Sequence, residues 1–276
     1  MPYSKDTPMR VAIVGLGNVG GAVTLRLAAG EIPQIRLTAI CSKDLEKARL
    51  FSKRLHPRPN VVPLAELPEH ADVVVECATY DAFAEIARVT LVAGKTLVAV
   101  SAGALGPNLH LIDLAEKHGG VIRISSGALP GLDLIRGARE SGIKSAKLIS
   151  RMRPESLAKE AYMIDKGFDF STPPAAPVHV FSGTAREASR AFPRHFNVAT
   201  TLSLAGAGLD DTTIELWVDD GIPGVIHRVE IDSEAVGLEL IARSWPSPTN
   251  KSTAAVVAPS VMATLRSMVS ALQLGN

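Results

Sequence analysis

Residues 11–20 read Val-Ala-Ile-Val-Gly-Leu-Gly-Asn-Val-Gly and lead into an apolar segment at 22–29. A run of buried-strand residues therefore precedes a Gly-x-Gly-x-x-Gly turn, and we expect this turn to open into a helix over 22–29. Gly15 suits a tight turn, Gly17 lets the backbone approach phosphate groups, and Gly20 lets the helix lie close to the strand. This order predicts a site for a dinucleotide pyrophosphate, with a purely structural turn as the alternative.

The composition is that of an ordinary globular protein. The 276 residues, 46% hydrophobic and 21% charged, suffice for two domains with sizeable cores. The net charge of +1, without a basic block, gives no reason to expect nucleic acid or a membrane surface as a partner. No apolar run reaches the roughly 18 to 20 residues of a membrane span, and residues 1–6 lack a signal-peptide core, so we expect a cytoplasmic location. Cys41 and Cys77 end predicted strands and are interpreted as small core residues, with no metal site expected.

Strands and helices alternate over the first part of the chain. This alternation predicts a doubly wound, Rossmann-type parallel sheet in a dinucleotide-binding domain over residues 1–127. Either Ser42 or Asp44 is expected to cap the helix that follows the second strand. The further strands are expected at 36–41, 72–77, 96–101 and 121–125, and the helices at 44–55, 80–93 and 108–118.

Longer strands with period-two alternation follow. They predict an α+β domain over residues 128–254, built on a mostly antiparallel sheet with helices on one face. A final helix at 255–272 is expected to pack back on the nucleotide domain, with Pro259 near its start. The strands are expected at 146–151, 178–182, 213–218, 225–231 and 238–243, and the helices around 186–192 and 199–206.

His227 is the first candidate for acid–base chemistry. In Val225-Ile-His-Arg-Val-Glu-Ile231 the alternation places His227 on the same face as Val225, Val229 and Ile231. An inward-facing histidine near neutrality can transfer protons, and a satisfied core histidine is the alternative.

Three further segments carry clusters of polar residues. Residues 192–200 run into an apolar helix, where Asn197 suits either an N-cap or a ligand contact. Residues 125–133 follow the last parallel strand, at the edge where such sheets bind ligands. Residues 246–253 combine hydroxyl, amide and ammonium groups that suit a carboxylate, or an ordinary solvated loop.

These segments together resemble the L-aspartate dehydrogenase family over nearly the whole chain. The resemblance implies that Ala128 and Asn197 contact the nicotinamide dinucleotide and that His227 is the catalytic histidine. It also implies a homodimer. The segments that carry it are 14–20 (Val-Gly-Leu-Gly-Asn-Val-Gly), 74–78 (Val-Val-Glu-Cys-Ala), 100–105 (Val-Ser-Ala-Gly-Ala-Leu), 126–133 (Ser-Gly-Ala-Leu-Pro-Gly-Leu-Asp), 192–199 (Phe-Pro-x-x-x-Asn-Val-Ala), the His227 strand and the loop at Asn250.

The chain departs from the family pattern at three places on the substrate side. The family usually has Asn where this chain has His195, and Asn-Pro-Lys-Thr-Ser where this chain has residues 250–254. It tends to have Lys-Pro-Pro where this chain has residues 153–155. The departures weaken the identification of the substrate and leave the cofactor assignment unchanged.

The resemblance implies an NAD(P)-dependent enzyme that converts L-aspartate to oxaloacetate and ammonia through an imine. A related dehydrogenase or imine reductase for another small amino acid, and an inactive nucleotide sensor, are the alternatives. Arg153 and His195 are assigned to the substrate, with a surface ion pair as the alternative for each. The predicted cofactor contacts are Gly15, Gly17, Asn18, Val19, Gly20, Ser42, Lys43, Ala78, Ala128 and Asn197, and the predicted substrate contacts are His195, Lys251, Ser252, Thr253 and Arg153.

Overall fold

The computed structural model describes residues 3–275 apart from Arg194 and Thr249. The chain forms two compact units. The first contains the residues up to Ser125 together with Ala258–Leu274, and the second contains Ser126–Val257.

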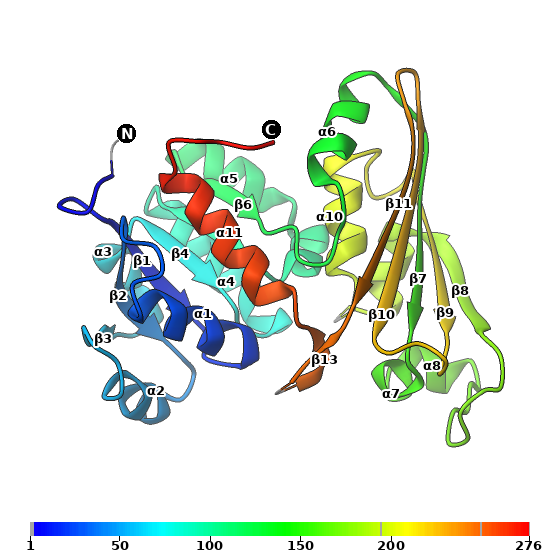
Figure 1. The fold of residues 1–276 in the computed structure, drawn as a ribbon, viewed down its shortest axis with the longest axis horizontal. Coiled ribbons are helices and arrows are strands. Elements are labelled where there is room, and N and C mark those ends of the chain that lie inside the picture. Colours follow the sequence, from blue (N-terminus) through cyan, green and yellow to red (C-terminus); the bar gives the residue numbers. More distant parts are fainter. Residues whose placement is uncertain (1–2, 194, 249, 276) are drawn as a thin grey trace. The chain divides into compact units, whose positions relative to one another are not determined.

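The first unit is built on a six-stranded parallel sheet in the order β3-β2-β1-β4-β5-β6 (Figure 1). This strand order and the helical connections confirm the Rossmann-type prediction. The direction in which successive strands are added to the sheet reverses between β1 and β4, which run parallel. Ligands of such sheets bind at that point, beyond the carboxyl ends of the strands. The strands are β1 (Met9–Val14), β2 (Ile35–Cys41), β3 (Asn60–Val61), β4 (Val73–Glu76), β5 (Thr96–Ala99) and β6 (Val121–Ile124).

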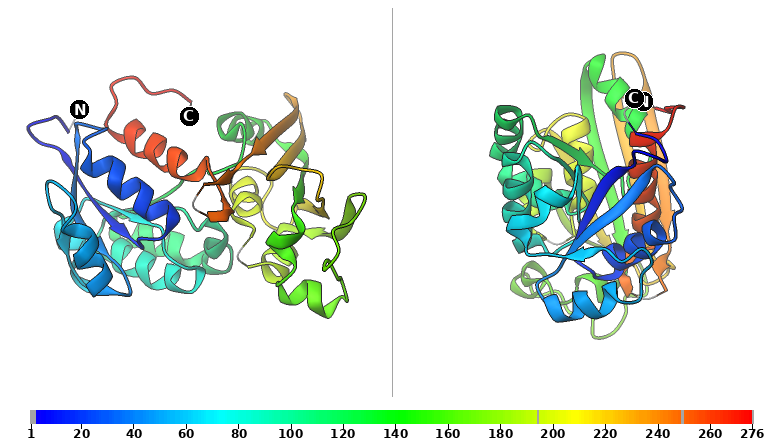
Figure 2. Two further views of the ribbon diagram at one scale, coloured as in Figure 1. Left: turned by 60° about the horizontal axis from the view of Figure 1, so that its bottom comes forward. Right: turned by 90° about the vertical axis from the view of Figure 1, so that its left-hand side faces the viewer.

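Helices cover both faces of this sheet. Figure 2 shows α1 and α11 on one face, and α4 and α5 on the other. Val23 of α1 and Leu265 of α11 lie in one buried cluster with Val11 and Ile13 of β1, so the last helix completes the core of the first sheet. The helices are α1 (Asn18–Ala28), α2 (Leu45–Ser52), α3 (Leu67–His70), α4 (Phe83–Val92), α5 (His110–His118) and α11 (Val257–Val269), with short 3-10 turns at Leu64–Glu66, Tyr80–Ala82 and Ala102–Asn108.

The helix boundaries differ from the expected ones in specific ways. Helix α1 begins at Asn18 rather than at residue 22, so Gly20 already belongs to its first turn. Helix α2 is capped by Asp44, whose side chain accepts a hydrogen bond from the Lys47 amide, and not by Ser42. Helix α11 ends at Val269, and Leu272 lies beyond it with 70% of its surface exposed. The apolar spacing in the sequence continues past the end of the helix. The spacing alone therefore does not show where the buried part of the segment ends.

The second unit contains a five-stranded sheet in the order β11-β10-β7-β9-β8. Three neighbouring pairs are antiparallel and β7 with β9 is parallel, so the sheet is mostly antiparallel as expected. Helices α6, α9 and α10 pack against one face, where the strand residues are buried (Figure 1). The strands are β7 (Ile143–Met152), β8 (Val178–Thr184), β9 (Thr212–Val218), β10 (Val225–Ser233) and β11 (Gly237–Ser244), and the helices are α6 (Leu132–Glu140), α7 (Pro154–Leu157), α8 (Ala161–Asp165), α9 (Ala185–Ala191) and α10 (Asn197–Ala205).

Several elements of the second unit were not expected. Helix α6 begins at Leu132, within the 125–133 segment, and α7 and α8 follow β7, where no helices were expected. Where a solvated loop was the alternative, β12 (Pro246–Ser247) and β13 (Asn250–Ala254) form a small antiparallel ribbon.

The opposite face of the five-stranded sheet carries charged side chains of both signs among half-exposed apolar ones. Lys147 pairs with Glu215 at 2.7 Å across β7 and β9, and Arg228 pairs with Glu239 at 3.3 Å across β10 and β11. Ile241 lies beside Arg228 in the strand register and is 44% exposed.

Leu265→Ala is expected to destabilise the first unit by about 2–5 kcal/mol, because it opens a cavity in the core between α11 and the sheet. The matched control is Leu272→Ala, which truncates the same side chain where it is exposed and is expected to change stability by less than about 0.5 kcal/mol. Denaturant unfolding of the full chain measures both. Equal effects of the two variants would contradict the packing described for α11.

Candidate functional site

The glycine turn after β1 packs backbone against backbone. Gly15 has a φ of +88°, and a Cβ added to it would lie 2.5 Å from the carbonyl oxygen of Cys77. A Cβ on Gly20 would lie 1.9 Å from the Gly15 carbonyl oxygen. Both glycines are therefore required by the protein itself, since any side chain would separate β1, α1 and the loop after β4.

Gly17 is different. A Cβ on Gly17 would meet nothing within 4 Å, so contacts among the described residues do not explain a glycine there. Gly17 is the N-cap residue of α1 and makes no side-chain cap. The N-terminus of a helix directs its first amides and its positive dipole end toward an anion placed beyond it. Val19 packs its side chain on the core and offers a ligand only its backbone. The turn therefore fits a dinucleotide pyrophosphate.

The residues after β2 lie beside this turn. The Gly15 amide donates to the Cys41 carbonyl at 2.8 Å, and Ser42 and Lys43 follow directly, the first half-buried and the second exposed. In this fold the adenosine ribose lies next to the end of the second strand. Asp44 is engaged as the cap of α2, and its hydrogen bond from the Lys47 amide lowers the pKa of its carboxyl group.

Ala78 lies in the loop after β4 and donates its amide to Glu76 at 2.8 Å. Glu76 is fully buried. It belongs to the 74–78 motif of the sequence, where no function was assigned to it. The signal for it was an acidic residue at the end of an otherwise apolar strand, Val73–Val75.

His227 lies on the helix-covered face of the second sheet, in β10. It is 4% exposed, and its Nδ1 atom lies 2.9 Å from the hydroxyl oxygen of Ser150, its partner in the register with β7. Burial lowers the pKa of His227 to about 4. The imidazole is therefore neutral at pH 7, and it can accept a proton when a nearby negative charge compensates for the burial.

Ser150 was not singled out in the sequence. The available signal was one hydroxyl on the apolar inward face of β7, between Leu148 and Met152. When His227 Nδ1–H donates to this hydroxyl, the lone pair is on Nε2, the atom a base needs. Among the described residues, Ser150 is the one hydrogen-bond partner of the ring.

Ala128 and Asn197 lie at turns of the second unit. Ala128 is in a turn closed by a hydrogen bond from the Leu129 amide to the Ser126 carbonyl, directly before α6. Asn197 is the first residue of α10, and Phe196 occupies the N-cap position without a side-chain cap. The interpretation of Asn197 as an N-cap is therefore wrong, because the helix begins at Asn197, one residue earlier than a cap at 197 requires.

His195 and Arg153 each have a carboxylate partner. His195 Nε2 lies 3.0 Å from Glu160 Oε1, with both side chains about one-fifth exposed. Arg153 pairs with Glu155 at 2.6 Å and Asp220 at 3.2 Å, and donates to the Ile222 carbonyl at 3.2 Å. Arg153 therefore lies in ion pairs, as the alternative interpretation of this residue described. His195 lies against a carboxylate within the structure, with most of its side chain buried.

Lys251, Ser252 and Thr253 lie in β13. Thr253 is half-buried, whereas the side chains of Lys251 and Ser252 lie outside the described residues. The ribbon gives the three residues a defined backbone directly before α11.

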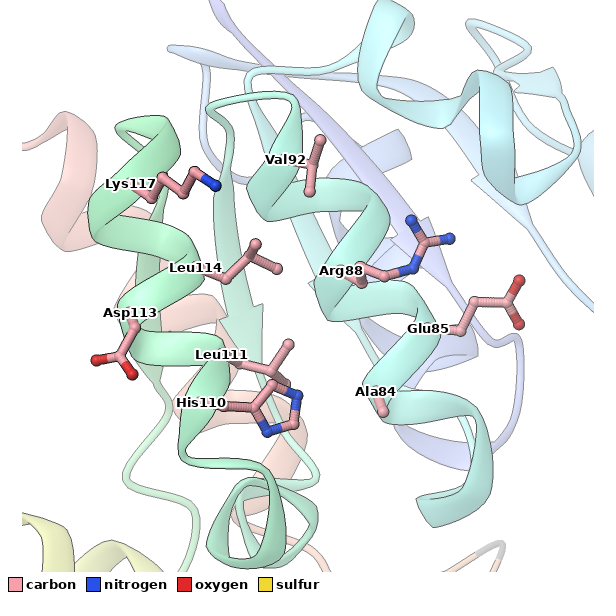
Figure 3. Close-up of a pocket in the computed structure, with 9 residues that line it drawn as sticks. All are labelled: Ala84, Glu85, Arg88, Val92, His110, Leu111, Asp113, Leu114 and Lys117. Atoms are coloured by element: carbon pink, nitrogen blue, oxygen red, sulfur yellow. The ribbon is translucent and has the colours of Figure 1, made fainter.

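No group of three or more His, Cys, Asp or Glu side chains that could hold a metal ion occurs among the described residues. Within the same residues, no helix has the length and apolar character needed to cross a membrane. A groove between α4 and α5 is lined by Leu111 and Leu114, with His110 and Lys117 directed into it (Figure 3). Its described lining includes none of the predicted site residues.

Comparisons with known proteins cover nearly the whole chain. A family model described as "Aspartate dehydrogenase, C-terminal" matches residues 133–268, and one described as "Homoserine dehydrogenase, NAD binding domain" matches residues 15–125. The chain is 39% identical to L-aspartate dehydrogenase 3 of Bordetella bronchiseptica, over 99% of this chain and 100% of that protein. It is 36% identical to an L-aspartate dehydrogenase of Bradyrhizobium diazoefficiens, over 99% and 96%.

A solved structure has the same fold. The crystal structure of aspartate dehydrogenase from Thermotoga maritima superimposes with a TM-score of 0.72 at 24% identity, covering 97% of this chain and 99% of that one. The likeness extends over both units.

Lowering the pH from 6.5 to about 4 is expected to destabilise the wild-type chain through His227. Its pKa is lower in the folded state than in the unfolded chain, so the unfolded chain takes up the proton first and stability is lost as pH falls. His227→Gln removes this contribution, which is on the order of 3 kcal/mol at the acid end. Denaturant unfolding at several pH values measures the difference in slope. Parallel slopes for the two proteins would contradict a buried, neutral imidazole.

Proposed function

The chain belongs to the L-aspartate dehydrogenase family, and from this premise we propose that it oxidises L-aspartate with NAD or NADP, giving oxaloacetate and ammonia through an imine. The observation that carries the proposal is His227, a buried neutral imidazole with Nδ1 occupied by Ser150, in the unit matched by the aspartate dehydrogenase model. An amino-acid dehydrogenase needs such a base at the amino group.

The glycine turn holds the cofactor in this proposal. The open position at Gly17 and the first amides of α1 bind the pyrophosphate, with Ala78 beside them. From the second unit, Ala128 and Asn197 contact the nicotinamide dinucleotide. Bound NAD or NADP in its oxidised form supplies the acceptor for the hydride that leaves the substrate Cα.

His227 acts first on the substrate ammonium group. It accepts one proton at Nε2, and the freed nitrogen lone pair then forms the C=N bond as the hydride leaves Cα. After His227 has released that proton to solvent, a water molecule adds to the imine carbon and gives a proton to the same nitrogen of the ring. The protonated ring returns it to the departing amino group. Ammonia then leaves as the hydroxyl group on the same carbon loses its proton to solvent and becomes the carbonyl. Ser150 keeps the ring in one orientation throughout.

The substrate itself makes His227 a stronger base. Burial favours the neutral ring, with a pKa of about 4. The two carboxylates of aspartate beside the ring favour the imidazolium and raise this pKa toward neutrality. A substrate with one carboxylate compensates less, so the buried imidazole itself favours a dicarboxylate.

Cationic and multidonor groups hold the carboxylates. We assign one carboxylate to Lys251, Ser252 and Thr253, from their chemistry, and the other to His195. Both residues already contact carboxylates, His195 that of Glu160 and Arg153 those of Glu155 and Asp220. Arg153 is the weaker candidate, because its guanidinium group also donates to a carbonyl of the β9–β10 turn. Its ion pairs support the turn that precedes the His227 strand.

A homodimer in the cytoplasm completes the proposal. The open face of the five-stranded sheet combines half-exposed Ile241 with cations and carboxylates, which suits an isologous contact with a second copy. Two free cysteines, Cys41 and Cys77, suit a reducing compartment.

L-Aspartate is expected to exceed L-alanine by at least ~100-fold in kcat/KM, because alanine leaves a cationic site unpaired and provides only one carboxylate for His227. Absorbance of the reduced cofactor measures both rates. Comparable rates, or turnover of another amino acid in place of aspartate, would contradict the substrate assignment and favour a related dehydrogenase. Cofactor binding without any turnover would favour a nucleotide sensor.

His227→Ala tests whether His227 is the base of the mechanism. It is expected to lose at least ~100-fold in kcat while still binding reduced cofactor. Full activity in this variant would make His227 a core residue only.

NADP is expected to serve at least as well as NAD. Asp44 is engaged as a helix cap, whereas the Ser42 hydroxyl and the Lys43 ammonium group can receive the 2′-phosphate. Titration of both cofactors measures the preference, and Lys43→Ala is expected to lower use of NADP by about tenfold with little effect on NAD. A strong preference of the wild type for NAD would indicate Asp44 as the ribose ligand.

A further inference from the structure

Glu76 is a buried carboxylate at the carboxyl end of β4. It has no exposed surface and accepts four hydrogen bonds. Oε1 accepts from the Ala78 amide at 2.8 Å and the Ser101 hydroxyl at 3.0 Å, and Oε2 accepts from the Ser101 amide at 2.9 Å and the Val100 amide at 3.3 Å.

The four donors come from two neighbouring strand ends. Ala78 follows β4, whereas Val100 and Ser101 follow β5. One carboxylate therefore fixes the first residues of two loops at the edge where the parallel sheet binds its ligand. All four contacts are donors, so only a group with four acceptor sites satisfies them. The ionised carboxylate is that group, and the NH₂ end of a glutamine would face two donors.

The loop fixed by Glu76 is the surface on which the glycine turn rests. A Cβ on Gly15 would lie 2.5 Å from the Cys77 oxygen and 2.9 Å from Ala78 Cα. A Cβ on Gly20 would lie 3.0 Å from Cys77 Cβ. A small shift of residues 77 and 78 is therefore transmitted to the turn and to the first amides of α1, since no flexible side chain lies between them.

Burying a carboxylate between two strands of this sheet costs desolvation free energy. Desolvation raises the pKa of Glu76, and the hydrogen bonds from Ser101, Ala78 and Val100 oppose that effect. The neighbouring pair Val75 and Val98 joins the same strands with apolar side chains only. The carboxylate thus supplies what apolar packing cannot, a directional hold on loop amides.

We propose that Glu76 is a positioning residue for nucleotide binding, which holds the loops after β4 and β5 so that Gly15 and the N-terminus of α1 keep the geometry that a dinucleotide pyrophosphate requires. The inference rests on the proposed function only in taking the glycine turn as the nucleotide site. It requires no particular substrate.

The test compares two full-length variants that remove one carboxylate each from the two ends of β4. Glu76→Gln alters the end at the nucleotide site. Asp72→Asn alters the opposite end, where Asp72 accepts from the Arg10 side chain at 2.7 Å and from its amide at 3.0 Å. Both variants are expected to lower the unfolding temperature. At a temperature where both are folded, the Kd for reduced cofactor, read by its fluorescence, is expected to rise about tenfold or more in Glu76→Gln and less than about twofold in Asp72→Asn.

Ser101→Ala keeps the test decisive if Glu76→Gln does not fold. It removes one donor to Oε1 and leaves the charge and the backbone donors in place, so a rise of about threefold in the same Kd is expected. An unchanged Kd in a folded Glu76→Gln protein would overturn the proposal. So would equal Kd values for Glu76→Gln and Asp72→Asn, or an unchanged Kd in Ser101→Ala when Glu76→Gln is unfolded.

The same measurements separate this inference from the proposed function. If the wild-type chain binds reduced cofactor but does not oxidise aspartate, the aspartate assignment is wrong. The role of Glu76 is then still tested by comparing the cofactor Kd of Glu76→Gln with that of Asp72→Asn. A wild-type chain that binds neither NADH nor NADPH overturns both.

Discussion

The close contact between the glycine turn and the loop after β4 is the constraint on which the first unit depends. Gly15 donates its amide to Cys41 at the end of β2, and its α carbon lies against the carbonyl of Cys77. The ends of three strands are thereby joined at one residue that has no room for a side chain. The sheet order places β1 between β2 and β4, so this contact forms the point at which the direction of winding reverses and at which a ligand can enter.

Two buried titratable side chains, Glu76 beside the glycine turn and His227 in β10, lie in different hydrogen-bonding environments. Glu76 is surrounded by four donors that oppose the effect of burial, and it is suited to holding backbone in place. His227 has one hydroxyl partner, and burial leaves it neutral with a pKa of about 4. A group with every acceptor site satisfied is fixed, whereas a group with a free nitrogen and a shifted pKa can respond to the charge of a ligand. The first therefore suits positioning and the second suits chemistry.

Periodicity predicted the elements of both sheets well, and it failed where burial depends on distant segments. The alternation that placed His227 inward in β10 is confirmed, because period two is a property of the strand itself. The end of α11 was wrong, since Leu272 continues the spacing but has no neighbour to cover it. Helix α6 was missed although its buried residues Ile135 and Ala138 have helical spacing. The ribbon of residues 246–247 and 250–254 was missed because its strands are too short to show a period of two. The cap of α2 could not be chosen from the sequence, because Ser42 and Asp44 both suit a cap and only the helix start decides between them.

The sequence by itself determined the alternation of the main strands and helices, the glycine turn and its nucleotide chemistry, the candidate histidine and the family. Each of these depends on residues that are neighbours in the chain. Only the tertiary structure decided what each polar side chain faces. It gave His227 a partner 77 residues away in Ser150, and it gave Glu76 donors from Val100 and Ser101 on the next strand. It also gave Arg153 the carboxylate of Asp220 and His195 that of Glu160. Such pairs form across strands and loops that folding brings together, and a hydrogen bond is set by distance and angle in space rather than by separation along the chain.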